Sequence, residues 1–124
     1  MKIAIKTQHA PGAIGPYSQA VACNGMIYVS GQLPIDSESG TIAEGVESQA
    51  RQSLKNIKAI LEAGDFNLSD VVKTTVFLKD INDFSVMNKV YGSFFEEPYP
   101  ARAAVEVARL PKDVKVEIEA IAVK

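Results

Sequence analysis

The residues of this chain best suited to chemistry are an arginine and two glutamates near its C-terminal end. Arg102 directly follows a Pro-x-Pro-Ala turn at the start of one expected strand, and Glu117 and Glu119 lie in a second expected strand. If the two strands pair, a fixed cation lies near fixed carboxylates. A guanidinium can bind a carboxylate through two parallel hydrogen bonds, and a neighbouring glutamate can position or activate a water. This arrangement is a candidate site for a small carboxylic acid.

The same three residues also have a purely structural interpretation. Arg102 would then cap a strand, and the two glutamates would line a solvated or intersubunit face with salt bridges. The spacing of the residues alone favours this structural interpretation.

Other catalytic constellations have little support. His9 is the only histidine and lies in a polar segment without a serine elbow, so we expect it at the surface. Cys23 is the only cysteine, which excludes an internal disulfide and a cysteine-based zinc site, and no activating base lies near it in sequence. We find no phosphate-binding glycine loop and no metal-ligand spacing, so we expect neither a cofactor nor a metal.

The length of 124 residues and a hydrophobic content of 47% predict one domain over residues 1–124 with one core. The net charge is -2, and its 13 basic and 15 acidic residues are scattered, so we do not expect nucleic acid as a partner. The N-terminus lacks the apolar stretch of a signal peptide, and no apolar run approaches the roughly 18 residues that span a membrane. We expect a soluble, cytoplasmic protein.

The first half of the chain predicts an edge strand, a hairpin and a helix. Met1 to Ile5 forms the edge strand, and Asn24-Gly25 joins strands 18–23 and 26–30 in a two-residue type I′ turn. Ser30 and Gly31 end the second hairpin strand. Gly31 either exposes its N–H to a ligand or forms a plain turn, and the turn is favoured. Apolar residues at helical spacing predict a helix from Val46 to Leu61, which Gly64 ends as a C′ glycine.

The second half predicts a strand, a helix and two further strands. The β-branched run Val71 to Leu78 is typical of a central strand. The side chains from Asp80 to Asp83 can cap the start of a helix. Asn88 lies one step off the apolar face of that helix, where its side chain reaches either a cleft or, more commonly, solvent. We assign that face to the core; it comprises Phe84, Met87, Tyr91, Phe94 and Phe95. Strict alternation from Val114 to Ala120 predicts a strand with one charged face.

The order of these elements predicts an α+β fold. We expect a single mixed sheet of about six strands with two helices on one face. The other face is expected to carry small residues such as Ala104 together with the charged residues of the last strand. Self-association is the simplest way to cover such a face.

Several motifs, in order and over nearly the whole chain, resemble the Rid family of reactive-intermediate deaminases, also called the YjgF family, and most of all its RidA type. They are Ala10-Pro11, Ile14 to Gln19, Ser30 to Gln32, Gln49 to Leu54, Lys73 to Asp80, Pro100 to Arg102, Ala108 to Lys112 and Val116 to Ala120. The resemblance implies a chorismate-mutase-like fold and a homotrimer with sites in clefts between subunits.

The resemblance also implies an activity. It is the hydrolysis of short 2-imino acids or their enamine tautomers, such as 2-iminobutanoate and 2-iminopropanoate, to 2-oxo acids and ammonia without a cofactor. Such intermediates escape from pyridoxal-phosphate enzymes such as threonine dehydratase. The alternatives are a trimeric small-carboxylate-binding protein or a holdase-like protein, with nuclease activity ranked last.

Residue by residue, the resemblance assigns carboxylate binding to Arg102 and the attacking water to Glu117, in preference to Glu119. The resemblance also places Tyr17 at the site, as a catalytic and substrate-binding residue, and Ser30, Gly31 and Asn88 as substrate-binding residues. One departure is clear, because many RidA-type members have Ser-Cys where this chain has Ala103 and Ala104. Thiol-dependent regulation at that position is therefore not expected here, whereas imine hydrolysis does not need the thiol.

Overall fold

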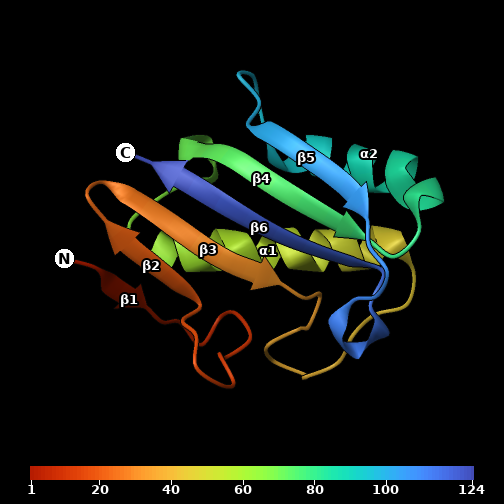
Figure 1. Cartoon of the computed structure of the whole chain (residues 1–124), viewed down its shortest axis with the longest axis horizontal. Helices are drawn as coiled ribbons and strands as arrows, with labels where there is room; N and C mark the ends of the chain where they lie inside the picture. The colour runs from red at the N-terminus through yellow and green to blue at the C-terminus, as the bar shows by residue number, and fades with distance from the viewer.

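One six-stranded sheet, covered on one face by two helices, is the framework of the chain (Figure 1). The computed structural model describes residues 1–124. The strands are β1 (Ile3–Ile5), β2 (Ala20–Cys23), β3 (Met26–Gln32), β4 (Val71–Leu78), β5 (Ala101–Glu106) and β6 (Val116–Val123). The helices are α1 (Val46–Ala63) and α2 (Phe84–Phe94), with short 3-10 helices η1 (Leu68–Asp70), η2 (Ile81–Asp83) and η3 (Pro111–Asp113).

The strands follow the order β1-β2-β3-β6-β4-β5 across the sheet. Only β4 and β5 run parallel, and every other neighbouring pair is antiparallel. The α+β class, the mixed sheet, the strand number and the one-sided helices are thus confirmed. Both helices lie behind the sheet in Figure 1, which leaves its other face open.

The hairpin is confirmed. Cys23 pairs with Met26, and the two turn residues between them, Asn24 and Gly25, have φ values of 50° and 75°. Positive φ at both central residues defines the type I′ turn, whose twist matches that of the flanking strands. Asparagine and glycine adopt this conformation at low cost, so the dipeptide fixes the register of β2 against β3.

The apolar face that the spacing of the residues predicts for α1 is buried against β3 and β6. Ala50, Leu54, Ile57 and Leu61 have no exposed surface. Burying a leucine or isoleucine side chain contributes about 1.5–3 kcal/mol, so this face holds the helix in place.

The C-terminal end of α1 differs from the expectation. Gly64 follows the last helical residue, but its φ is -97°, and the left-handed residue is Asp65 with φ 63°. Gly64 is required by packing instead, since a Cβ atom there would lie 2.9 Å from Cδ1 of Ile27 and 3.6 Å from Cδ1 of Ile5. The helix end therefore packs against β1 and β3 at a point where a side chain does not fit.

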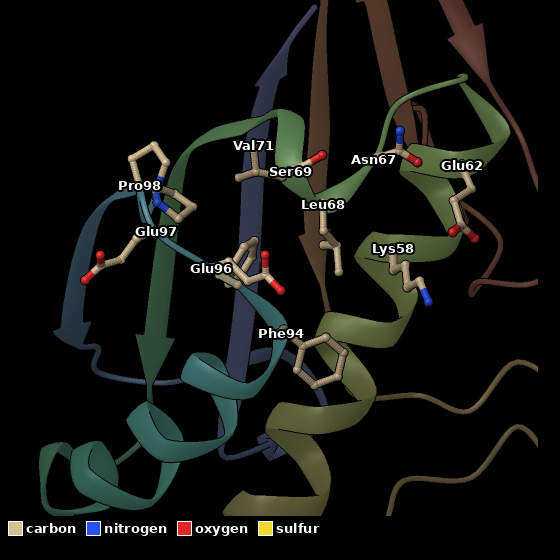
Figure 2. Close-up of a pocket in the computed structure, with 12 residues that line it drawn as sticks. Lys58, Glu62, Asn67, Leu68, Ser69, Val71, Phe94, Glu96, Glu97 and Pro98 are labelled. Carbon is tan, nitrogen blue, oxygen red and sulfur yellow. The ribbon is translucent and has the colours of Figure 1, made fainter.

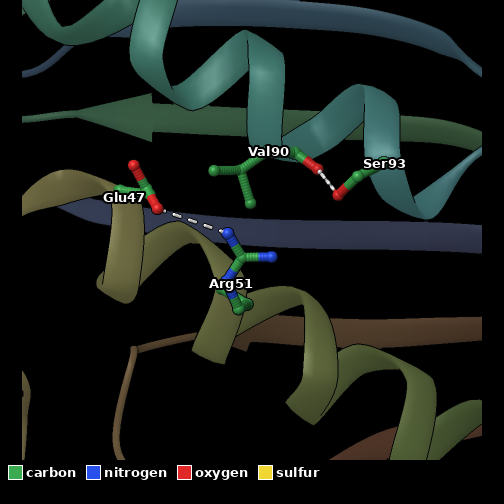
Figure 3. A network of polar contacts seen from close by, with 4 residues as sticks. All are labelled: Glu47, Arg51, Val90 and Ser93. Atoms are coloured by element: carbon green, nitrogen blue, oxygen red, sulfur yellow. Dashed lines mark hydrogen bonds and ion pairs between the residues drawn. The ribbon is translucent and has the colours of Figure 1, made fainter.

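α2 begins after η2, where Asp80 accepts a hydrogen bond from the backbone N–H of Asn82. The apolar face that the sequence assigns to the core is buried at Met87, Tyr91 and Phe95. Outside the core, the surface between the helices carries solvated polar groups (Figure 3). There the exposed Arg51 bridges Glu47 one turn earlier at 3.5 Å.

The C-terminal strands correct two expectations. β5 does not pair with β6, because β4 lies between them and pairs with both. Ala104 lies opposite Val76, which is fully buried, so Ala104 faces the helices and Ala103 faces the open side. The predicted alternation holds from Val116 to Ala120, but β6 begins two residues later than expected.

Neither α1 nor α2 combines the length and the apolar character that a membrane-spanning helix needs.

Candidate functional site

Glu117 lies on the open face of the sheet and covers Gly31. It pairs with Phe77 of β4, whose neighbours Val76 and Leu78 are both buried under the helices. Glu117 therefore projects away from the helices. A Cβ atom at Gly31 would overlap the Glu117 carboxylate and lie 2.9 Å from its Cδ. The glycine provides the space in which this carboxylate lies.

Gly31 is a strand residue and not a turn, which corrects the favoured expectation. It lies in β3 where the register against β6 shifts between Val29 and Gln32, which marks a β-bulge. A bulge bends the strand and redirects nearby side chains. The bulge thus brings the backbone at Gly31 against Glu117.

Ser30 connects this region to the segment that carries Tyr17. Its hydroxyl donates to the carbonyl of Ser18 at 2.6 Å, and its backbone N–H donates to the carbonyl of Gln19 at 3.0 Å. Tyr17 is 54% exposed and lines an open cavity of about 740 Å³. Ser30 is thus bonded to the residue that follows Tyr17, and its neighbour Gly31 lies against Glu117.

Buried amide side chains hold the segments around this region. Gln19 is 4% exposed, and its Nε2 donates to the carbonyls of Thr7 and Pro11 while its Oε1 accepts from the backbone N–H of Thr7. Gln49 of α1 accepts at 2.8 Å from the backbone N–H of Lys115, which immediately precedes β6. These bonds fix the loop before Tyr17 and the start of the strand that carries Glu117.

The electrostatic environment of Glu117 favours its protonated form. Partial burial raises the pKa of its carboxyl group, and the negative charge of Glu119, two residues along on the same face, raises this pKa further. A carboxylate with a raised pKa is a stronger base towards water than an ordinary glutamate.

Arg102 lies at the opposite side of the sheet, against α2. It pairs with Thr74, which is buried under the helices. The Arg102 guanidinium lies 4.7 Å from the ring centroid of Tyr91 and 5.3 Å from that of Phe84. Its Nη1 donates to Oδ1 of Asn88 at 2.7 Å. The guanidinium is thus held by three side chains of one helix.

An open cavity of about 500 Å³ adjoins this arginine. The residues that line it are Asn88, Tyr91, Gly92, Tyr99, Pro100 and Arg102. With two aromatic walls and one cation, it suits a small molecule that carries a carboxylate. The sequence left open whether Asn88 reaches a cleft or solvent. In the structure Asn88 is exposed, lines this cavity, and forms a side-chain hydrogen bond with Arg102.

Within one chain, Arg102 and Glu117 do not meet. Arg102 shares the side of the sheet with Thr74, and Glu117 shares the other side with Phe77. Side chains of successive strand residues point to opposite faces, so no rotamer change brings these two together. The expectation that a cation and a carboxylate lie side by side on paired strands is wrong for the single chain.

A third cavity, of about 390 Å³, contains none of the predicted site residues (Figure 2). It lies between the C-terminal half of α1, η1 and the loop after α2. Lys58 and Glu62 come from the helix, and Glu96 and Glu97 come from the loop. Its mixed charges give no preference for a carboxylate, and we do not assign the site to it.

No group of three or more histidine, cysteine, aspartate or glutamate residues is arranged to hold a metal ion. His9 is exposed, as expected, and Cys23 is a half-buried free thiol.

The structure adds three residues that sequence reasoning did not assign to a site. Tyr91 and Phe84 were assigned to the core, and Thr74 was an ordinary strand residue. The helical spacing contains a usable signal, because Phe84, Asn88 and Tyr91 are separated by four and three residues and share one face. That face meets β5 at Arg102.

Comparisons with known sequences and structures identify the family of this chain. The chain belongs to the Endoribonuclease L-PSP family, which matches residues 7–124. This is the YjgF or Rid family that the motifs resemble. A protein of Salmonella typhimurium named 2-iminobutanoate/2-iminopropanoate deaminase is 57% identical, and the alignment covers 100% of this chain and 99% of that protein.

Solved structures of relatives share the whole fold. The YjgF gene product of Escherichia coli is 55% identical with a TM-score of 0.95, and the match covers 98% of each chain. Escherichia coli TdcF, solved with bound serine, is 53% identical with a TM-score of 0.94, again over 98% of each chain. The TdcF structure contains a small amino acid, a molecule with a carboxylate.

Proposed function

We propose that this chain is a cofactor-independent deaminase that hydrolyses 2-iminobutanoate and 2-iminopropanoate to the 2-oxo acids and ammonia. The observation that carries the proposal is the full-length identity of 57% to a protein named for this reaction. The geometry is in accord with it, because Arg102 faces an open cavity and Glu117 has a pKa raised by burial. A carboxylate-binding cation and a base for water are the two groups that the reaction needs.

In the proposed mechanism, Arg102 binds the carboxylate of the imino acid. The imine reacts as its protonated iminium form. Glu117 accepts a proton from a water whose oxygen adds to the iminium carbon, and the π pair of the C=N bond moves to nitrogen to give a carbinolamine. Glu117 passes that proton to the amine nitrogen, ammonia leaves with the C–N electron pair, and the hydroxyl proton returns to the Glu117 carboxylate to leave the 2-oxo acid. The protein acts chiefly by orientation, which reduces the entropic cost of bringing water and imine together.

Tyr17, Ser30 and Gly31 are proposed to line the part of the site near the imine, together with Glu117. Asn88 is proposed to contribute to the part near the carboxylate. The contacts of Ser30 with Ser18 and Gln19 support the first group, and the contact of Asn88 with Arg102 supports the second.

We further infer that the chain works as a homotrimer with each site between two subunits. The support is the placement of Arg102 and Glu117 on opposite faces, which a second copy overcomes by bringing its Glu117 to the Arg102 cavity. The open face of the sheet also carries exposed apolar residues, with Tyr28 and Val105 each 43% exposed. Covering such a face is a usual reason for self-association.

A non-catalytic carboxylate-binding or holdase-like protein is the alternative. Pure capture of a carboxylate needs Arg102 but does not need a base, so Glu117 separates the two functions. Nuclease activity is disfavoured by the net charge of -2, because binding to a phosphate backbone depends on clustered cations. We place the activity in the cytoplasm, where pyridoxal-phosphate dehydratases would release the imino acids.

The test is a coupled assay in which threonine dehydratase generates 2-iminobutanoate and its decay is followed. We expect the parent protein to accelerate decay, Arg102→Ala to abolish the acceleration, and Glu117→Gln to abolish it while still binding 2-oxobutanoate. Arg51→Ala is the matched control, since Arg51 is an exposed arginine outside the site. An Arg102→Ala variant as active as the parent would refute the assigned role.

A further inference from the structure

We propose that Tyr91, anchored by Thr74, is a positioning residue that fixes the plane of the Arg102 guanidinium for binding of the substrate carboxylate. The inference rests on the proposed function and extends it to two residues that act through Arg102. Its basis is a chain of contacts from the buried core of the sheet to the cavity.

The first contact is the hydrogen bond between the Tyr91 hydroxyl and Oγ1 of Thr74, at 2.7 Å. Both residues are buried, with 5% and 1% exposure. A buried hydroxyl without a partner costs about 1–3 kcal/mol, so each hydroxyl holds the other in place. Burial accordingly raises the pKa of the Tyr91 phenol, which remains a neutral hydrogen-bonding group at neutral pH.

The second contact is the guanidinium over the Tyr91 ring, 4.7 Å from its centroid. A guanidinium over an aromatic face is attracted by about 0.5–2 kcal/mol, depending on its exposure to water. The ring of Phe84, 5.3 Å away, adds a second aromatic contact. Stacking of this kind restricts the plane of the guanidinium without using its N–H donors.

The third contact restricts rotation within that plane. Nη1 donates to Oδ1 of Asn88 at 2.7 Å, and this is the one hydrogen bond of the Arg102 side chain. A guanidinium has five N–H donors, so four stay available for a carboxylate. Bidentate binding depends on a fixed orientation of the fork, which the ring and the amide together provide.

The register of the sheet connects these contacts. Thr74 lies directly opposite Arg102 in the parallel pair of β4 and β5. The residue that anchors the ring is therefore the strand neighbour of the arginine that the ring holds. A simple core role for Tyr91 accounts for its hydroxyl partner but does not require a position beneath this cation.

The experiment measures the binding of 2-oxobutanoate by calorimetry, together with kcat and KM for imine hydrolysis. The variants are Thr74→Val and Tyr91→Phe, which remove one hydroxyl each, and Tyr91→Leu, which removes the ring. We expect about 3- to 10-fold weaker binding for each hydroxyl variant and at least about 10-fold for Tyr91→Leu, mostly in KM. Thr74→Ser, which keeps the hydroxyl, should restore parental binding, and the double hydroxyl variant should bind no more weakly than either single one.

Phe66→Leu is the control for a general loss of packing, because Phe66 is a buried aromatic residue that does not contact Arg102. It should destabilise the fold and leave 2-oxobutanoate binding within about twofold of the parent. Thermal unfolding of every variant identifies loss of the fold. Parental binding and KM in both Tyr91→Leu and Thr74→Val would overturn the positioning role.

The two proposals fail in different ways. If the parent binds 2-oxobutanoate through Arg102 but does not hydrolyse the imine, the deaminase function falls, and the binding series still decides the role of Tyr91. If the parent hydrolyses the imine and the Tyr91 and Thr74 variants retain its KM, only the positioning role falls. A parent that neither binds nor hydrolyses would overturn both.

Discussion

The carboxylate of Glu117 occupies the space that a side chain at Gly31 would fill. The two residues lie on neighbouring strands, and the bulge in β3 brings the backbone of one under the side chain of the other. The position of the proposed base therefore depends on the absence of a single methyl group.

Substitution of Gly31 by alanine should displace the Glu117 carboxylate. We expect at least about a tenfold fall in imine hydrolysis, since a shift of about 1 Å in a reacting group can cost this much. Binding of 2-oxobutanoate should fall less than turnover. Gly12→Ala is the control, because a Cβ atom at Gly12 meets nothing within 4 Å. Parental turnover in Gly31→Ala would contradict a role for Glu117 in this position.

The acidic limb of the pH profile should report Glu117. Its raised pKa means that the ionised base is lost at a higher pH than for an ordinary glutamate as the solution is acidified. Replacing Glu119 by glutamine removes a neighbouring negative charge, lowers the pKa of Glu117 and should shift this limb of kcat/KM to lower pH. An unchanged profile in Glu119→Gln would show that another group controls this limb.

Subunit mixing tests the location of the site. Arg102→Ala and Glu117→Gln should each be inactive alone. The two variants are then mixed at equal ratio, unfolded and refolded together. If each site takes Arg102 from one subunit and Glu117 from another, each of the two residues is present at a given site half the time. About a quarter of the sites should therefore be complete, and the mixture should recover about a quarter of parental activity. Light scattering should give the mass of a trimer. A mixture without activity, from proteins that refold, would place both residues in one subunit.

Ser53 should be a site of easy stabilisation. Its side chain in α1 is fully buried, and its hydroxyl has no hydrogen-bond partner. Ser53→Ala removes an unpaired polar group and improves helix propensity, so we expect a gain of about 1 kcal/mol in the free energy of unfolding. Urea unfolding measures it. Ser48→Ala on the exposed side of the same helix should gain less than half as much, and a destabilised Ser53→Ala would indicate an unrecognised partner for the hydroxyl.

Gly64→Ala separates the two explanations for the end of α1. Its φ of -97° suits any residue, but its Cβ would lie 2.9 Å from Cδ1 of Ile27. Overpacking of this kind costs about 1–3 kcal/mol. The double variant with Ile27→Val should recover part of this loss in urea unfolding. If Ile27→Val gives no recovery, the cost lies in the backbone and not in the contact.

The local patterns predicted the elements because each pattern acts over a few residues. Asn24-Gly25 defined its turn, and the alternation around Ile118 defined the buried face of β6. The pairing of β5 with β4 was not predictable in this way, because a short strand does not specify its partner. From that error followed the wrong face for Ala104.

The candidate site shows the same division. The types and spacing of the residues singled out Arg102, Glu117 and Glu119 but favoured a structural role for them, and the family resemblance assigned Arg102 and Glu117 to the site. The separation of Arg102 from Glu117 depends on the strand order of the whole sheet. The dependence of Glu117 on Gly31 and of Arg102 on Tyr91 arises only when distant segments pack together.

The sheet that separates Arg102 from Glu117 also has a consequence for how the rate responds to concentration. In a single chain, the Arg102 guanidinium lies on one face of the sheet and the Glu117 carboxylate lies on the other. Under the proposed assembly, the rate per chain falls when the protein is diluted to the range where the subunits dissociate. A newly synthesised chain is inactive until it assembles with other subunits. Protection against reactive imines would then begin only above a threshold abundance of the protein.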